Sequence, residues 1–326
     1  MSDRVYDAVV VGGSFAGLGA ALQLARARRR VLVVDAGRPR NRFARTSHGF
    51  LGQDGQPPGL ILDTARKQVL AYPTVEFRSG EVAAARVRDE GFELTLASGE
   101  TLTGRRLILA TGVVDELPEL PGLKERWGVT VLHCPYCHGY EVAGRRLGVL
   151  ATSELSIHQA LLIPDWSDNV TLFTNGAFSI DADQQAALAS RGVRVEERLV
   201  AEVVGDVPDL EGVRLHDGKV VPVDALFTGA RTRLASPLAE QLGCEIYDGP
   251  IGPVIRTDER KQTTVPGVYA AGDAARFPHT VSWAVADGVM AGIGAHQSLA
   301  LSGSTAAASS HSGQSGATQQ RVGSDR

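Results

Sequence analysis

The chain has 326 residues, 43% of them hydrophobic, which is enough for two domains with packed cores. A formal net charge of −4 gives no basic stripe to neutralise a phosphate backbone, so we expect no nucleic-acid partner. No apolar run reaches the roughly 20 residues that span a bilayer, and we see no signal peptide, so we expect a cytoplasmic protein without a membrane partner.

The first part of the chain alternates strand and helix patterns. Residues 6–11 predict a buried strand, residues 16–28 an amphipathic helix and residues 30–35 a second strand, which together make a βαβ unit. Further strand-like runs follow at residues 75–88, 92–96 and 106–110.

A glycine-rich loop lies where the first strand turns into the first helix. Backbone N–H groups and the positive end of the helix dipole favour a pyrophosphate in that place. The pattern G-x-G-x-x-G is met imperfectly, because Ser14 stands at its middle glycine. For the loop alone, a tight turn without a ligand is the alternative interpretation. The predicted dinucleotide-binding residues are Gly12, Gly13, Ser14, Ala16 and Gly17 in the loop, and Asp35 for a ribose.

The run at 106–110 ends in Ala110, Thr111 and Gly112, and a proline-rich stretch at 117–122 has the character of a hinge. A second strand-helix-strand pattern follows at 146–151, 153–163 and 169–174, which indicates an inserted α/β domain.

The last part of the chain resembles the first domain again. Residues 268–273 predict a strand and a turn that contains Gly272 and Asp273, and residues 281–301 predict a long helix. For Asp273 alone, a plain helix N-cap is an equal alternative. From residue 303 onward almost no bulky apolar residue occurs, so we expect residues 303–326 to be disordered.

Cys134 and Cys137 form a C-x-x-C pair with His133 before it and His138 after it. This spacing can close into a disulfide, and a thiolate at a helix N-terminus is stabilised, so the pair is a candidate two-electron redox centre. His138 is the first candidate for proton transfer and His133 the second. Zinc binding and a purely structural pair of thiols are the alternatives; no second ligand cluster follows at zinc spacing, and we expect no metal. Cys244 is expected to be a buried small hydrophobic residue.

Taken together, residues 12–17, 110–112, 134–137 and 271–273 resemble low-molecular-weight thioredoxin reductases over about residues 4–301. The resemblance implies an α/β fold of two Rossmann-like three-layer domains, FAD as cofactor and a homodimer. It places the FAD-binding domain at residues 1–116 and 234–302, and an inserted pyridine-nucleotide-like domain at 117–233. It also implies that Cys137 faces the flavin, that Cys134 meets the substrate and that Asp273 holds the ribityl chain.

Two departures from that family pattern bear on function. His138 stands where those reductases carry an aspartate as proton donor. After the strand at 146–151, a glycine loop for NADPH is expected, but residues 151–156 read ATSELS, with Glu154 near the place of the pyrophosphate. We therefore expect NADPH binding to be lost, with the inserted domain carrying the cysteines and completing the fold.

The segment at 134–141, CPYCHGYE, combined with the missing nicotinamide loop resembles the dithiol oxidases that close disulfides in natural products such as gliotoxin and holomycin. This resemblance implies a small-molecule dithiol substrate, electron transfer from the cysteine pair to FAD, and reoxidation by O2 with H2O2 as product. A reductase of thioredoxin or another protein disulfide, fed by NADPH or ferredoxin, is the alternative. A flavin-based redox sensor is the minor alternative.

Overall fold

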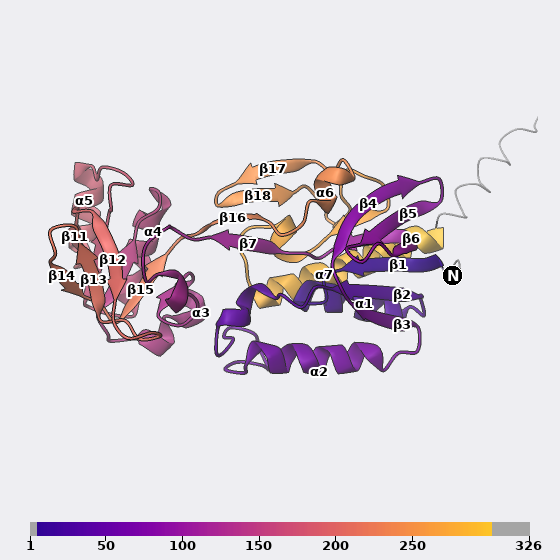
Figure 1. Ribbon diagram of the computed structural model, residues 1–326, viewed down its shortest axis with the longest axis horizontal. Helices are drawn as coiled ribbons and strands as arrows, with labels where there is room; N and C mark the ends of the chain where they lie inside the picture. The colour runs from indigo at the N-terminus through magenta and orange to yellow at the C-terminus, as the bar shows by residue number, and fades with distance from the viewer. Residues whose placement is uncertain (1–4, 302–326) are drawn as a thin grey trace, which may run out of the picture.

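A seven-stranded sheet built from both ends of the chain forms the larger half of the molecule (Figure 1). The computed structural model describes residues 5–301, so the segment 303–326 that was expected to be disordered lies outside the described residues. The path of the sheet is β3-β2-β1-β6-β5-β4, and β19 pairs with β6. Its strands are β1 (Val5–Val11), β2 (Val31–Asp35), β3 (Val75–Ser79), β4 (Val82–Arg88), β5 (Gly91–Leu96), β6 (Thr101–Leu109) and β19 (Val268–Ala270).

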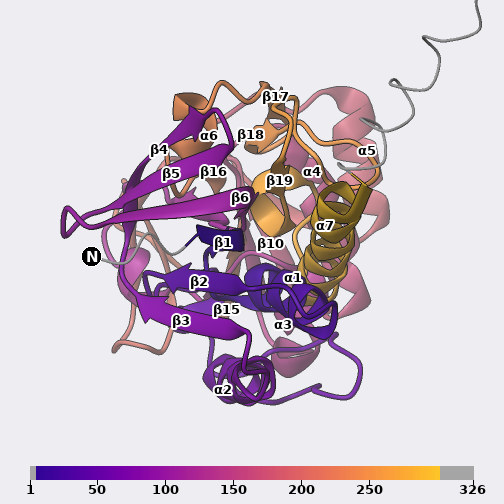
Figure 2. The ribbon, with the colours of Figure 1, turned by 90° about the vertical axis from the view of Figure 1, so that its right-hand side faces the viewer.

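The parallel part of this sheet is buried on both faces. Alternate residues of a strand point to opposite sides, so Val10 and Val33 pack against the helices while Val9 and Leu32 pack on the other face. Figure 2 shows the strands in order from β4 to β3 with the helices alongside. These helices are α1 (Phe15–Arg26), α2 (Pro58–Leu70) and α7 (Val281–Leu301), and the opposite face carries α6 (Leu238–Gln241), β17 (Ile246–Gly249) and β18 (Gly252–Ile255).

A second, five-stranded parallel sheet lies in the middle of the chain, in the order β11-β10-β9-β15-β8. Two separate hydrophobic clusters cover its two faces, which gives this half its own core. Its elements are β8 (Val131–Leu132), β9 (Leu147–Leu150), α4 (Leu155–Leu162), β10 (Val170–Phe173), α5 (Ala182–Ser190), β11 (Arg194–Glu196) and β15 (Ala225–Thr228), with a small sheet of β12 (Val200–Val204), β13 (Gly212–Leu215) and β14 (Val220–Pro222). The fold is α/β with two Rossmann-like units, as the sequence predicts.

Two antiparallel strands, β7 (Val113–Glu116) and β16 (Arg231–Leu234), connect the two halves (Figure 1). The proline-rich stretch at 117–122 follows β7 directly, where the chain enters the second half. The short helix α3 (Pro135–His138) lies in the second half on the side that faces the first (Figure 1).

The predicted elements occur in the predicted order, with shifted ends. The run at 75–88 forms two strands, because Gly80 with φ +157° breaks it between β3 and β4. The helix expected from 153 begins at Leu155, and the helix expected to reach 28 ends at Arg26. Among residues 5–301, no helix combines the length and the hydropathy that crossing a membrane requires.

Candidate active site

The glycine loop after β1 is held against the ends of two other strands. A Cβ on Gly12 would lie 2.2 Å from the carbonyl oxygen of Ala110, and one on Gly272 would lie 2.9 Å from the Cβ of Ala16. Gly12 and Gly272 also have positive φ angles, +105° and +75°, which favour glycine. The fold thus brings the three predicted segments, 12–17, 110–112 and 272–273, together at the carboxyl ends of β1, β6 and β19.

The start of α1 offers free polar groups at this edge. Ser14 occupies the N-cap, but its side chain makes no capping hydrogen bond to the helix. The first N–H groups of a helix have no partner inside the helix, so they and the dipole favour a phosphate. Gly13 sits so close to Asp35 that a Cβ there would lie 2.7 Å from the Asp35 Cβ.

Asp35 ends β2 and borders a cavity. Its Oδ1 accepts the N–H of Gly13 at 3.1 Å, and its Oδ2 accepts from Arg66 at 3.3 Å. The cavity measures about 370 Å³ and also includes Arg66 and Phe77, whose guanidinium carbon and ring centre are 4.4 Å apart. An open hollow with a carboxylate and a flat cation at the end of the second strand suits the ribose and base of a dinucleotide.

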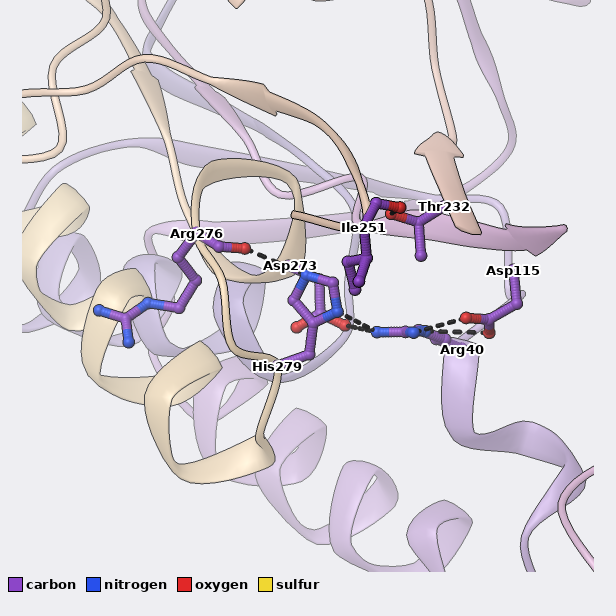
Figure 3. A network of polar contacts seen from close by, with 7 residues as sticks. All are labelled: Arg40, Asp115, Thr232, Ile251, Asp273, Arg276 and His279. Carbon is purple, nitrogen blue, oxygen red and sulfur yellow. Dashed lines mark hydrogen bonds and ion pairs between the residues drawn. The ribbon is translucent and has the colours of Figure 1, made fainter. Parts of the chain in front are cut away.

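Arg40, on the 3-10 turn η1 (Arg40–Phe43), joins four parts of the chain (Figure 3). Its Nε donates to Asp115 at 3.0 Å, and its Nη1 donates to Asp273 at 2.9 Å and to His279 Nδ1 at 2.6 Å. His279 Nε2 lies 3.0 Å from the carbonyl oxygen of Arg276, which can only accept, so Nε2 carries the hydrogen and Nδ1 accepts from Arg40. Burial lowers the pKa of His279, which keeps the ring neutral.

This network anchors the connection between the halves. Asp115 lies on β7 opposite Thr232 of β16, and Asp273 lies on η5 (Gly272–Ala275) directly after β19. Arg40 therefore ties one connecting strand to the predicted ribityl-binding aspartate (Figure 3). Sequence reasoning missed Arg40 and Asp115. Arg40 stands in a basic loop just after Asp35. No pattern in the sequence links it to Asp115 or Asp273, which lie 75 and 233 positions further along the chain.

A buried polar atom near this turn has no partner in the protein. The side-chain oxygen of Asn41 is buried and makes no hydrogen bond. Such an atom costs free energy unless a ligand or water satisfies it. Together with the free N-terminus of α1 and the cavity at Asp35, this fits FAD laid along the carboxyl ends of the strands, as the resemblance to thioredoxin reductases implies.

Cys134 and Cys137 have opposite tendencies to ionise. Cys134 is the N-cap of α3, and Pro135 takes the first helical position. The Cys137 thiol and the backbone N–H groups of Cys137 and Tyr136 donate to the Cys134 sulfur and lower its pKa, with Arg40 adding to the effect. The same S–H donation, with burial and the Asp273 carboxylate, raises the pKa of Cys137. The proton shared by the pair therefore stays on Cys137.

The two histidines beside the pair face different surroundings. Burial lowers the pKa of His133 most, and Arg40 lowers it further; its buried Nδ1 makes no hydrogen bond. Burial also lowers the pKa of His138, while Glu141 raises it and His48 lowers it. His133 thus shares the Arg40 network, whereas His138 faces a separate cluster that sequence reasoning did not identify.

The remaining candidates fall outside these clusters. Cys244 is buried and its thiol donates to the Thr263 hydroxyl at 3.5 Å. Within residues 5–301, the structure contains no group of three or more His, Cys, Asp or Glu side chains that could hold a metal ion.

At the edge of the second sheet where relatives with a glycine loop would bind NADPH, polar groups of this chain are hydrogen-bonded to one another. The N–H of Thr152 donates to the Ser156 hydroxyl at 3.1 Å, and the Thr152 hydroxyl donates to the carbonyl oxygen of Gly229 at 2.8 Å. Glu154 is the exposed N-cap of α4. After β11, at the end of the same sheet, Arg198 forms ion pairs with Glu196 and Asp217.

Comparison with known proteins finds a matching family, a curated relative and two similar solved structures. Residues 6–288 match the family described as pyridine nucleotide-disulphide oxidoreductase. A curated relative, thioredoxin reductase tcpT of Claviceps purpurea, is 37% identical over 302 residues, which cover 89% of this chain and 93% of the relative. An oxidoreductase from Agrobacterium tumefaciens has a similar structure, with a TM-score of 0.88 and 50% identity over 91% of this chain and 99% of that one. The structure of HlmI gives a TM-score of 0.88 and 39% identity, over 96% and 98% of the two chains.

Proposed function

This chain belongs to the pyridine nucleotide-disulphide oxidoreductase family, and from that premise we propose that it is a dithiol oxidase that forms a disulfide in a small-molecule substrate and uses O2 as acceptor. As a member of the thioredoxin reductase-like flavoproteins it is an enzyme, an FAD-dependent disulfide oxidoreductase. The direction of electron flow and the substrate are what we propose beyond that.

The observation that carries the proposal is the internal hydrogen bonding and the acidic residue at the nucleotide edge of the second half. A phosphate-binding loop needs backbone N–H groups free to meet the ligand. Here the N–H of Thr152 is already bonded to Ser156, and the carboxylate of Glu154 stands at the start of α4. Both features disfavour a pyrophosphate, so electrons are expected to enter through thiols rather than from NADPH.

The cysteine pair is arranged for that entry. A substrate thiolate attacks the sulfur of Cys134 in the oxidised Cys134–Cys137 disulfide; the new sulfur–sulfur bond forms as the old one breaks and leaves Cys137 as a thiolate. The second thiolate of the substrate then attacks the substrate sulfur that is bonded to Cys134. This step releases the cyclised product and leaves Cys134 as a thiolate. Cys134 is the leaving group in this second step, and the backbone N–H groups of Cys137 and Tyr136 stabilise the thiolate that it leaves as.

Each protein residue has a separate task in this scheme. We assign Cys137, which lies close enough to Asp273 for that carboxylate to raise its pKa, to the flavin side. We assign His138 as the base that accepts a substrate proton. Gly12, Gly13, Ser14, Ala16, Gly17, Asp35, Ala110, Thr111, Gly112, Gly272 and Asp273 would hold FAD. When bound, FAD supplies the two-electron acceptor that O2 can reoxidise with release of H2O2.

The test is anaerobic mixing of the oxidised holoenzyme with NADPH and, separately, with a small dithiol, followed by O2. We expect the dithiol, but not NADPH, to bleach the flavin absorbance, and O2 to restore it with one H2O2 per dithiol. Rapid bleaching by NADPH would contradict the proposal and identify a reductase. Bleaching by neither reagent would direct the search to a protein donor such as ferredoxin.

A further inference from the structure

His48 lies on a loop of the first half that reaches toward α3. The loop closes on itself, because Ser47 and Gln56 pair as an isolated antiparallel bridge and Gly49 N–H donates to Asp54 at 2.8 Å. His48 is mostly buried, with 19% of its side chain exposed. A histidine held by a closed loop has a defined orientation toward the other half of the molecule.

The imidazole of His48 meets two residues that follow the cysteine pair. Its Nε2 lies 3.4 Å from the Oε1 of Glu141, which belongs to the 3-10 turn η3 (Tyr140–Val142). Its ring centre lies 6.4 Å from that of His138, and the two rings are nearly perpendicular at 84°. Residues 48 and 138 come from different halves, so this contact exists only while the halves keep the arrangement of this structure.

The groups that face this cluster are few. His48 also contacts the Thr46 hydroxyl at 3.0 Å through Nε2 and the Asp54 carboxylate at 3.6 Å through Nδ1. The charges that act on His138 are those of Glu141, which follows α3 on the same half, and of His48 on the first half. Asp54 and Glu141 are 68% and 36% exposed, so a proton that reaches them can pass to water.

We propose that His48 is a positioning residue for His138, which it orients together with Glu141 and connects to solvent during proton transfer. This inference rests on the proposed function. His138 takes the proton of the substrate S–H bond, the resulting thiolate attacks Cys134 in the Cys134–Cys137 disulfide, and the proton then leaves His138 to the water beside Glu141 and His48. No electrons move in this relay, and the charge on His138 returns to its starting value.

The inference explains why a base on the second half has its partner on the first half. The His138 ring is partly buried, and this burial lowers its pKa. With His48 and Glu141 in contact, the base is complete when α3 faces the flavin-binding half, and incomplete when the halves separate. Substrate deprotonation is thereby tied to the arrangement in which the cysteine pair meets the Arg40 network.

The test compares His48→Gln and Glu141→Gln with the wild-type holoenzyme and with His158→Gln, an exposed histidine of α4, as control. Two quantities are measured against pH: the NMR titration of the His138 ring, assigned with His138→Asn, and the rate of flavin bleaching by a small dithiol. Because Glu141 raises the pKa of His138 and His48 lowers it, Glu141→Gln should move the titration to lower pH and His48→Gln to higher pH. Both should slow bleaching about tenfold near neutral pH.

Opposite shifts in the two variants would support the positioning role, because a general loosening of the structure would not move one residue's titration in both directions. Unchanged titration and unchanged bleaching profiles in both variants would overturn it. Each variant must keep the flavin absorbance spectrum, and since Glu141 is on the other half from His48, one variant still tests the contact if the other fails to fold. If a dithiol does not bleach the wild-type enzyme, the proposed function fails, while the NMR titration still tests the contact.

Discussion

At the cysteine pair, two chemically identical thiols acquire different proton affinities from their places on one short helix. Cys134 precedes the first turn and receives the N–H groups of Tyr136 and Cys137, whereas Cys137 lies inside α3 and donates its own S–H. An N-cap position stabilises a negative charge. The order of the two cysteines along the chain therefore decides which one carries the thiolate.

This difference predicts the order of alkylation in the reduced enzyme. Iodoacetamide should modify Cys134 well before Cys137 near neutral pH, because only the thiolate reacts. In Cys137→Ser the hydroxyl still donates to the Cys134 sulfur, so Cys134 should stay reactive, whereas in Cys134→Ser the remaining Cys137 should react slowly. Mass spectrometry after timed quenching measures both rates, and the buried Cys244 serves as the unreactive reference.

The same variants test the role assigned to Cys137. Cys137→Ser should retain FAD and abolish bleaching by dithiols, since without the Cys134–Cys137 disulfide the substrate thiolate has no sulfur–sulfur bond to attack and no thiolate remains on the flavin side. Equal alkylation of the two cysteines, or bleaching of Cys137→Ser at the wild-type rate, would contradict the assignment.

What the sequence predicts at this scale depends on distance along the chain. The pair Cys134 and Cys137 stands out because its spacing is local and a helical turn joins the two. Arg40, Asp115 and Asp273 form one network across 233 positions, and of these Arg40 and Asp115 each resemble an ordinary surface charge in the sequence. Single-sequence reasoning has no signal for such a group, so the Arg40 and His48 contacts emerge only from the fold.

At the scale of elements, α1 and α7 cross so closely that glycine is required at the contact. A Cβ on Gly288 of α7 would lie 2.0 Å from the carbonyl oxygen of Ala16, and one on Gly292 would lie 2.6 Å from that of Ala20. Since Ala16 belongs to the dinucleotide loop region, this contact also fixes the start of α1 against η5. Helix packing here determines the position of the cofactor-binding edge.

Gly288→Ala should therefore destabilise the protein by about 3 kcal/mol, within the range for overpacked cores, and weaken FAD retention. The matched control is Gly59→Ala in α2, where a new Cβ meets nothing within 4 Å. There the same exchange should stabilise the protein by up to about 1 kcal/mol, because alanine favours the helix. Thermal unfolding followed by circular dichroism and by release of fluorescent FAD gives both values. A neutral Gly288→Ala would show that the helices can move apart.

The apolar pattern of the sequence predicts strands that are buried inside a sheet. It misses short strands that pair with a segment far away in the sequence. Strands such as β1 and β2 are continuous apolar runs, which the sequence displays directly. β7 and β16 are short, partly exposed and paired across more than a hundred residues, so no local pattern indicates them. In the sequence, only the prolines at 117–122 indicate the connection between the halves. Its two strands are known only from the structure.

At the scale of the whole molecule, the separate cores of the two sheets support two folding units. We propose boundaries near residues 116/117 and 233/234, where β7 ends and β16 lies, with 1–116 and 234–302 as the FAD-binding domain. We also propose a homodimer, by resemblance to the family. The catalytic groups then lie between the domains, since the cysteines come from one and Arg40 and His48 from the other.

Three neutral histidines at this junction make stability depend on pH. His133 and His138 belong to the inserted half and His279 to the FAD-binding half, and burial is the largest cause that lowers the pKa of each. The unfolded chain takes up protons near pH 6.5, while the folded protein takes them up only at lower pH. Between those limits the unfolded state binds more protons, so the free energy of unfolding falls as the pH falls.

The urea midpoint of the wild-type enzyme should accordingly be lower at pH 5.5 than at pH 7.5, with each histidine contributing at most about 1.4 kcal/mol per pH unit. His279→Asn should lose less stability over the same interval, because asparagine does not titrate and its side-chain oxygen, placed like Nδ1, can still accept from Arg40. His158→Asn, at an exposed position of α4, should follow the wild type. A wild-type midpoint that is unchanged or higher at pH 5.5 would mean that these rings are already protonated in the folded protein, and the Arg40 network would then have to be rebuilt around a charged His279.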